Sequence, residues 1–367
     1  MDQISVYIHW PFCTKKCPYC DFNSFVSDKI DHNRWSKVYL RAIDFYCELL
    51  NTKKIRSIFF GGGTPSLATS NMIQSIINKL RLISHFTEDI EITLEANPTS
   101  VEAKKFSEFR DAGVNRVSLG IQSLRNKNLK FLGRHHSVDE AIAAIESVKA
   151  SFDNYSLDFI YALPHQTLKD WENELNEVIS LASNHLSLYQ LTIENGTKFG
   201  TMAKAGLLNE IDESLALDMF DITDEITTNN GLYRYEVSNH ARVGFESLHN
   251  LNYWQYGDYI GIGPGAHGRY GRPKVMTVDV RQPELWIKSV TEKGNGLDKR
   301  DILTNEDMRI EKIMMGMRMK DGIDISLILD KNIDELTQQN LIEVIGNKIL
   351  ITRNGIKLLN SVIAKLI

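Results

Sequence analysis

Three of the four cysteines lie close together, in the segment Cys13-Thr-Lys-Lys-Cys17-Pro-Tyr-Cys20. Three thiolates on one short loop can each bind one iron of a cubane iron–sulfur cluster. The fourth iron then has no nearby protein ligand, and such an open metal position is where another molecule can bind. The spacing therefore predicts a [4Fe–4S] cluster with Cys13, Cys17 and Cys20 as metal ligands.

Two other interpretations of these cysteines are weaker. Zinc knuckles prefer paired C-x2-C units, and the sequence has no second pair. A disulfide framework is typical of small exported chains, whereas this chain has 367 residues and no signal pattern. Cys47 stands apart in DFYCELL, on a probable helix, and is expected to be a buried structural thiol.

The cysteine spacing and a glycine run resemble the radical SAM superfamily. Its members bind S-adenosylmethionine (SAM) on such a cluster and cleave it reductively. Gly61-Gly62-Gly63-Thr64-Pro65 follows the second predicted strand, as in that family, where this run meets the amino group and backbone of SAM. Glycine suits this place because it lets the main chain approach a ligand closely.

The resemblance extends to further motifs: YIHWPFC, EANP, GIQS, LGRHH and SLDFIYALP. The cofactor-binding residues that it implies are Tyr7, Tyr19, Gly62, Gly63, Thr64, Glu95, Gln122, Arg134 and Asp158. Any one of the charged residues alone would more often be a surface carboxylate or a salt-bridged arginine. Several such residues, each near the carboxyl end of a predicted strand, favour a SAM site instead.

Within the superfamily, the long matches resemble the coproporphyrinogen III oxidase-like branch. That branch contains oxygen-independent dehydrogenases, which decarboxylate two propionates in haem synthesis, and haem chaperones. The dehydrogenases typically add a cysteine two residues after the third and a longer segment before the motif. Here Phe22 occupies that position, and His249-Asn250-Leu-Asn-Tyr253-Trp254 matches the H-N-x-x-Y-W motif associated with haem binding in the chaperone type.

The resemblance is therefore nearest to the haem-chaperone type, and it makes His249 the expected haem ligand. A histidine beside flat aromatic rings suits a haem, although such residues are also common in protein cores. A coproporphyrinogen III dehydrogenase is the alternative, and a radical enzyme with an unrelated substrate is a third. Expected cofactors are the [4Fe–4S] cluster and SAM, with haem as cargo, and no catalytic residue is assigned.

Strand and helix patterns alternate through the first half of the chain. Strands are predicted at 5–10, 55–60, 90–96, 115–121, 156–163 and 185–193, with helices between them, for example at 71–83 and 169–182. Unusual polar residues, including Glu194, follow the ends of these strands, which is where a barrel gathers its active site. We therefore predict an α/β fold built as a partial (β/α)6 barrel rather than an open doubly wound sheet.

After residue 200 the pattern changes. A helix is predicted to end at Gly231, a Gly-rich stretch and a charged break near KGNGLDKRD follow, and a helix is predicted from Thr304 to Gly322. Gly346-Asn347 predicts a hairpin turn. The expected domains are the barrel core (1–200), a covering extension with the H-N-x-x-Y-W motif (201–300) and a winged-helix-like unit (301–367) within an α+β extension.

Composition narrows the choice of partners. Forty-two basic and 47 acidic side chains leave a net charge of −5, so no strong basic field argues for a nucleic-acid partner. No apolar run is long enough to span a bilayer, and we expect a cytoplasmic protein, peripheral to the inner membrane face at most. The expected partners are haem and haem-accepting respiratory proteins, and a homodimer is left open.

Overall fold

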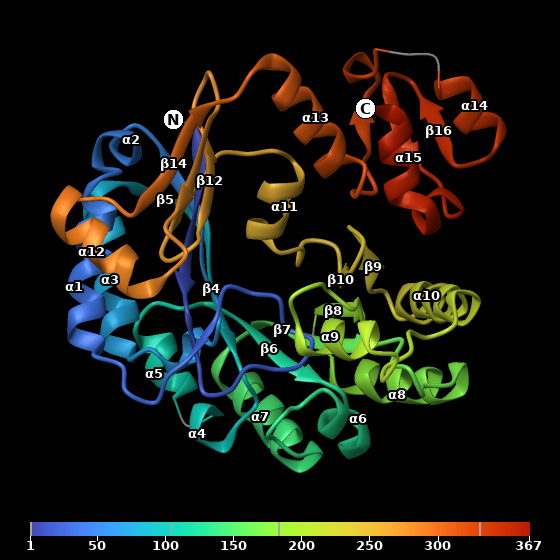
Figure 1. Cartoon of the computed structure of the whole chain (residues 1–367), viewed down its shortest axis with the longest axis horizontal. Coiled ribbons are helices and arrows are strands. Elements are labelled where there is room, and N and C mark those ends of the chain that lie inside the picture. The colour runs from blue at the N-terminus through green and yellow to red at the C-terminus, as the bar shows by residue number, and fades with distance from the viewer. Residues whose placement is uncertain (1, 104, 183, 330–331) are drawn as a thin grey trace.

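The computed structural model describes residues 2–103, 105–182, 184–329 and 332–367. Within them, one large sheet has a parallel centre in which strands that follow one another are neighbours. These strands are β1 (Gln3–Trp10), β4 (Lys54–Gly62), β5 (His85–Ala96), β6 (Arg116–Gln122), β7 (Asn154–Tyr161) and β8 (His185–Gln190). This order, curved as Figure 1 shows, is the predicted partial barrel.

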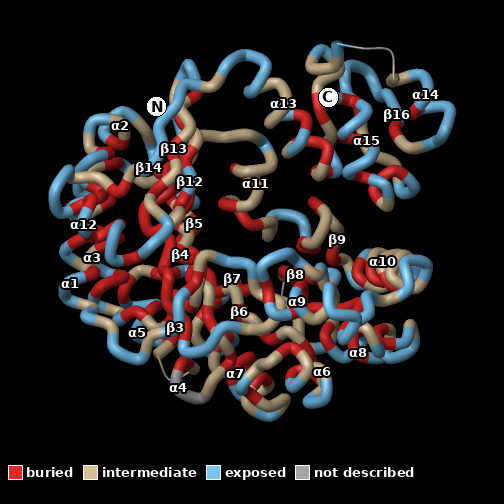
Figure 2. Tube along the Cα trace, viewed as in Figure 1, coloured by how far each residue is buried: buried red, intermediate tan, exposed pale blue. Residues whose placement is uncertain are grey.

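Helices pack along the outer side of this sheet (Figure 1). They are α1 (His32–Asp44), α2 (Cys47–Asn51), α3 (Ser70–Ile83), α4 (Ser100–Ala103), α5 (Phe106–Asp111), α6 (Asn126–Phe131), α7 (Val138–Ser151), α8 (Leu168–Leu181) and α10 (Glu213–Asn229). The short α9 (Lys198–Lys204) instead lies against the cysteine segment, where Phe199 N donates to Pro18 O at 2.8 Å. Ser137 begins α7 and Thr167 begins α8, each with a reciprocal capping box. The buried positions in Figure 2 follow the strands and the helix faces turned toward them.

Residues alternate sharply between the two faces of the parallel strands. In β6, Val117 and Leu119 belong to the apolar core under the helices, whereas Arg116 and Ser118 line cavities on the inner side. In the same way β7 and β8 turn Asp158 and Ser187 inward and bury leucines outward. Because strand side chains alternate with period two, one face builds the core and the other a polar interior.

The sheet is wider than the sequence pattern predicted. Beyond β1 it continues with β11 (Tyr259–Ile262), β12 (His267–Tyr270), β13 (Val275–Asp279) and β14 (Leu297–Ile302), and beyond β8 with β10 (Asn239–Ala241) and β9 (Tyr233–Arg234). The predicted charged break near KGNGLDKRD is wrong in part, because Leu297–Ile302 pairs with β13. Its charged side chains are exposed at a sheet edge, where charge discourages pairing with other chains.

Two other boundaries need correction. The strand predicted at 185–193 ends at Gln190, after which the chain turns to line the rim of the barrel. The helix predicted from Thr304 to Gly322 is α13 (Asn305–Gly316). It ends early because Ile323 packs against Gly316, where a Cβ would lie 2.4 Å from its Cγ2. That tertiary contact requires the chain to turn back.

The C-terminal segment forms a small separate core. A three-stranded antiparallel sheet, in the order β15 (Ile323–Asp324), β17 (Lys348–Ile351), β16 (Ile342–Ile345), packs with α13, α14 (Asn332–Gln338) and α15 (Leu359–Leu366). Gly346 turns the predicted hairpin with a φ of 60°. This agrees with the predicted winged-helix-like unit, while the domain boundaries at residues 200 and 300 stay predictions.

The remaining elements are short or connect the main ones. They are β2 (Phe12–Cys13), β3 (Phe25–Val26), α11 (Leu248–Trp254), α12 (Pro283–Lys293) and the 3-10 turns Pro65–Leu67, Ile325–Leu327 and Gly355–Leu358. The predicted helix end at Gly231 is confirmed, since α10 stops at Asn229 and Gly231 has a φ of 75°.

Candidate functional site

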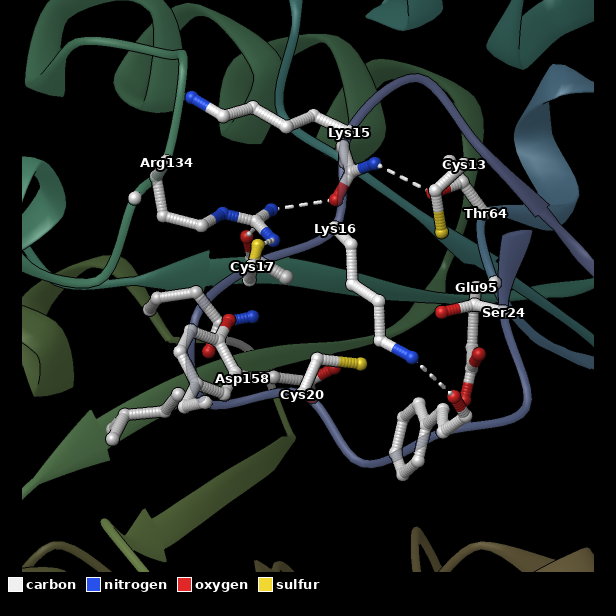
Figure 3. Close-up of a pocket in the computed structure, with 18 of the residues that line it drawn as sticks. Cys13, Lys15, Lys16, Cys17, Cys20, Ser24, Thr64, Glu95, Arg134 and Asp158 are labelled. Atoms are coloured by element: carbon white, nitrogen blue, oxygen red, sulfur yellow. Dashed lines mark hydrogen bonds between the residues drawn. The ribbon is translucent and has the colours of Figure 1, made fainter. Parts of the chain in front are cut away.

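The cysteine loop lies over the carboxyl ends of the parallel strands. Its two ends are held together by the short parallel pair β2 and β3 and by a hydrogen bond of 3.2 Å from Ser27 N to Cys13 O. Within the loop, Cys20 N donates to Cys17 O at 3.2 Å, and this turn joins the second and third cysteines. All three line a cavity of about 390 Å³ (Figure 3).

The chemistry of these donors fits an iron–sulfur cluster. The three thiols are free, and burial raises the pKa of Cys13 and Cys20, so a metal must displace their protons. Among the described residues no three His, Cys, Asp or Glu side chains surround one ion position. A cubane instead takes each thiolate at a separate iron, and Cys47, which contacts Asp44 on α1, does not line the cavity.

Two glycines let the main chain pass close beneath the cysteine loop. Gly63 N donates to Trp10 O at 2.7 Å and Thr64 N to Phe12 O at 2.8 Å. A Cβ on Gly63 would lie 2.6 Å from Phe12 O, and one on Gly62, whose φ is 111°, would lie 2.6 Å from the ring of His9. Only glycine permits this contact, which fixes the loop on the end of β4.

Glu95 faces the cavity from β5. Its Oε2 accepts a hydrogen bond of 3.0 Å from the amide of Gly62. Burial, followed by repulsion from Asp158, raises the pKa of Glu95 to about 8. A carboxyl group held in this way is ready to lose its proton when a cationic or hydroxyl-bearing ligand arrives.

The raised pKa predicts a pH effect on stability. Between about pH 4.5 and 8 the unfolded chain loses the Glu95 proton while the folded protein retains it, so rising pH lowers the free energy of unfolding. Glu95→Gln should abolish this pH-dependent fall in the free energy of unfolding, which we expect to be on the order of 2–4 kcal/mol. The fall is smaller than the full pKa shift would give because the side chain faces an open cavity. Urea unfolding of SAM-free protein at several pH values in this range measures it.

Glu88→Gln is the matched control, since Glu88 is exposed on the same strand. It should keep the wild-type pH dependence. Identical pH profiles for wild type and Glu95→Gln would show that this carboxyl is ionised throughout the range.

Arg134 connects the cysteine loop to the strand ends. Its guanidinium lies 3.7 Å from Cys17 Sγ and donates to Asn97 Oδ1 at 2.5 Å and to Gly120 O at 3.0 Å. Asn97, in EANP, also donates to Thr64 Oγ1 at 3.2 Å. Asn97 is a site residue that was not predicted, and its signal in the sequence is its position directly after the strand that carries Glu95.

Gln122 has an unusual backbone. Its φ is 70°, and the pairing of β6 with β7 shifts register between Leu119 and Gln122. Such a bulge redirects a side chain, and a non-glycine residue at positive φ persists only where its surroundings hold it. Irregular backbone of this kind is common at binding sites, which agrees with the predicted role of Gln122.

The structure brings most of the predicted residues to one cavity. Its lining includes Cys13, Cys17, Tyr19, Cys20, Gly62, Gly63, Thr64, Glu95, Gln122, Arg134, Asp158 and Glu194. Asp158 lies deeper, where it accepts from Ser118 at 2.8 Å and Ser156 at 2.9 Å. His135 and His136 also line the cavity, whereas His267 is exposed on β12.

Tyr7 and His249 lie elsewhere, in a second and smaller chamber inside the barrel. The Tyr7 hydroxyl is 3.0 Å from His9 Nδ1. His249 is 1% exposed, and both ring nitrogens are engaged, with Ser57 Oγ at 2.8 Å and the Tyr253 hydroxyl at 2.9 Å. Burial lowers its pKa to about 3, so the ring is neutral. Iron ligation by His249 would require the bond to Tyr253 to open.

Residues 7–178 match the model of the radical SAM superfamily, and residues 303–358 match that of the HemN C-terminal domain. A zebrafish (Danio rerio) protein named radical S-adenosyl methionine domain-containing protein 1, mitochondrial, is 36% identical over 88% of this chain and 74% of its own.

Two bacterial relatives are named haem chaperone HemW. The Escherichia coli protein is 38% identical over 78% of this chain and 76% of its own, and the Haemophilus influenzae protein is 40% identical over 74% and 72%. Among solved structures, E. coli coproporphyrinogen III oxidase (HemN) matches 100% of this chain and 90% of its own, with a TM-score of 0.84 and 21% identity. At that identity the likeness concerns the fold alone.

Proposed function

Because the chain belongs to the radical SAM superfamily, in the group that includes the HemW proteins, we propose that it is a haem chaperone. It would bind haem and deliver it to haem proteins. The observation that carries the proposal is the 38–40% identity to two proteins named as haem chaperones over most of their length. Haem-accepting respiratory proteins are the proposed acceptors.

Superfamily membership implies a [4Fe–4S] cluster and SAM. We propose that Cys13, Cys17 and Cys20 hold the cluster and that Glu95, Gln122, Arg134 and Asp158 contact SAM, supported by their common cavity. When bound, the cluster supplies an electron for reductive chemistry at SAM. The chain's own residues would orient SAM, and Glu95, with its proton released to water, would accept a hydrogen bond from a hydroxyl or ammonium group of SAM.

The second candidate is a coproporphyrinogen III dehydrogenase. The shared fold and a cavity that contains most of the predicted SAM-binding residues favour it. Phe22 argues against it, since this position, where the dehydrogenases typically have a further cysteine, carries a phenylalanine that is 57% exposed and lines the cavity.

The place of action is part of the proposal. No helix in the described ranges is long and apolar enough to cross a membrane. Delivery to respiratory haem proteins would then need only peripheral contact with the membrane face that carries them.

The test compares haem transfer with porphyrinogen turnover. Anaerobically reconstituted protein is loaded with haem and mixed with an apo-haem protein, and transfer is followed by the Soret band of the acceptor. We expect transfer in minutes and no consumption of coproporphyrinogen III with SAM and reductant. Conversion of coproporphyrinogen III to protoporphyrinogen IX at a catalytic rate, without haem transfer, would establish the dehydrogenase instead.

One further arm concerns His249. If this side chain ligates haem iron, His249→Ala should shift or abolish the Soret band and leave iron content and SAM binding intact. An unchanged Soret band would place the iron ligand elsewhere and leave His249 as the buried partner of Ser57 and Tyr253. Transfer to an acceptor is the decisive readout, since apolar surfaces also bind haem adventitiously.

A further inference from the structure

A second chamber of about 190 Å³ lies inside the barrel, next to the cluster cavity. Glu95, Ser118, Asp158 and Tyr189 line both spaces, so the two are adjoining. The chamber is formed by the inward positions of the parallel strands, which are polar. Of the residues considered above as cofactor contacts, it contains Tyr7 and His249 as well as the two shared carboxyl groups.

Arg116 is the cation of this chamber. It lies on β6, is 2% exposed, and its Nε has no hydrogen-bond partner among the described residues. The nearest acid is Glu91, whose Oε2 is 3.9 Å from that Nε, beyond hydrogen-bonding distance. A buried guanidinium with so little pairing is unfavourable unless another group accepts hydrogen bonds from it.

Glu91 is itself satisfied by other groups. Its carboxylate accepts from Ser247 Oγ at 3.1 Å, from Leu248 N at 2.9 Å and from His249 N at 3.0 Å. It therefore fixes the start of α11 and cannot turn to pair closely with Arg116. The guanidinium is left to face the chamber.

The other wall of the chamber is the H-N-x-x-Y-W helix. His249, Asn250 and Tyr253 line it from α11. Across from them, Asn239 Oδ1 has no hydrogen-bond partner in the described part of the chain. The chamber thus presents a loosely paired cation together with neutral donors and acceptors and the carboxyls of Glu95 and Asp158, and this cation can anchor a small polar anion.

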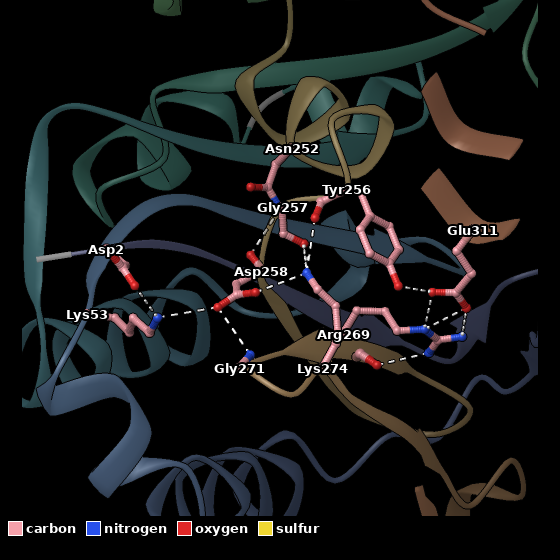
Figure 4. Close-up of polar contacts among 11 residues, drawn as sticks. Asp2, Lys53, Asn252, Tyr256, Gly257, Asp258, Arg269, Gly271, Lys274 and Glu311 are labelled. Carbon is pink, nitrogen blue, oxygen red and sulfur yellow. Dashed lines mark hydrogen bonds and ion pairs between the residues drawn. The ribbon is translucent and has the colours of Figure 1, made fainter. Parts of the chain in front are cut away.

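The end of α11 is firmly anchored (Figure 4). Asn252 Nδ2 donates to Asp258 O at 3.1 Å, and the Asp258 carboxylate pairs with Lys53 and Lys274. Beyond it, Tyr256 and Arg269 both donate to Glu311 of α13. This network holds the helix between the sheet and the C-terminal unit, so the chamber wall is fixed in place.

We propose that this chamber binds a carboxylate group, with Arg116 as its anchor. Guanidinium and carboxylate match in geometry and charge. The volume is below the roughly 300–1,000 Å³ of pockets for drug-sized ligands, so it admits a short-chain acid or the carboxylate arm of a larger ligand seated in the adjoining cavity. Burial raises the pKa of Glu95 to about 8, so this carboxyl is largely uncharged near neutral pH and repels such a group less.

Titration calorimetry of the reconstituted protein with sodium propionate tests the free acid. We expect saturable binding that propionamide, the neutral isostere, does not show. Arg116→Gln should weaken propionate at least tenfold. Arg41→Gln, at an exposed position on α1, should leave it unchanged. If Arg116→Gln does not fold, Asn250→Asp decides, because this isosteric change adds a negative charge to the chamber and should abolish binding.

The second arm distinguishes the source of the carboxylate and rests on the proposed function. Haem is compared with its dimethyl ester, which lacks free propionates, in wild type and Arg116→Gln. An arm of a larger ligand predicts that Arg116→Gln weakens haem and not the ester. The inference is overturned if neither propionate nor haem depends on Arg116, or if propionamide binds as well as propionate. Failure of haem transfer alone contradicts the chaperone proposal and leaves the propionate result standing.

Discussion

Replacing Cys13, Cys17 or Cys20 by alanine is expected to reduce bound iron from about four atoms per chain to nearly none and to abolish the broad visible absorbance. The three thiols are the cysteine ligands that the cavity offers. A cubane that loses one of only three protein ligands has two irons without protein donors. Iron analysis and absorbance spectra after anaerobic reconstitution measure the effect.

Cys47→Ala is the matched control. This thiol lies outside the cavity and contacts Asp44, so the variant should keep wild-type iron content. Circular dichroism of each variant tests whether the fold persists. Native protein that contains stoichiometric zinc, or a Cys17→Ala variant that retains all its iron, would contradict the cluster assignment.

Gly62→Ala is expected to abolish tight SAM binding while the barrel still folds. The residue has a φ of 111°, and a Cβ there would lie 2.6 Å from the His9 ring and 2.8 Å from Trp10 O. A non-glycine residue in such a conformation costs about 1–3 kcal/mol, and relief of the clash must move the strand end that donates to Glu95. We expect at least a tenfold loss of SAM affinity by calorimetry.

Gly244→Ala separates backbone strain from the contact. Gly244 has a φ of 88°, and nothing lies within 4 Å of the position its Cβ would take. This variant should show a stability loss of about 1–3 kcal/mol from strain alone and normal SAM affinity. Equal SAM affinity in Gly62→Ala and wild type would mean that the glycine run does not form the SAM site.

The core of the fold is predictable because its signals are local. Alternating strand and helix patterns give six parallel strands, and capping residues such as Ser137 and Thr167 mark helix starts. The cysteine loop proposed to hold the cluster is predictable for the same reason, since three cysteines on one loop need no long-range contact to identify them. Strand ends of a parallel barrel meet at one rim, which explains why Glu95, Gln122 and Asp158 share a cavity.

The extension of the sheet was not predictable by the same reasoning. Leu297–Ile302 is rich in charge and has no apolar alternation, because an exposed edge strand is held by backbone bonds to β13 and needs no buried face. The end of α13 at Gly316 depends on Ile323 returning against it. Both features arise from partners distant in sequence, which a local pattern does not contain.

By itself the sequence determined the cysteine loop, the glycine run beneath it and the parallel strands whose ends form the rim of the barrel, since each depends on residue type and spacing. Only the tertiary structure decided what Arg116 and His249 do. Arg116 looks like an ordinary charged residue at a strand start, yet the barrel encloses it and leaves it only a loose ion pair with Glu91, 3.9 Å from its Nε. His249 belongs to a motif that suggests a ring nitrogen free to bind haem iron, yet both nitrogens form hydrogen bonds, one with Ser57 and one with Tyr253, which lie on two different elements. The physical reason is enclosure: burial and the partners of a polar atom are set by how the sheet curves and by which helix closes it.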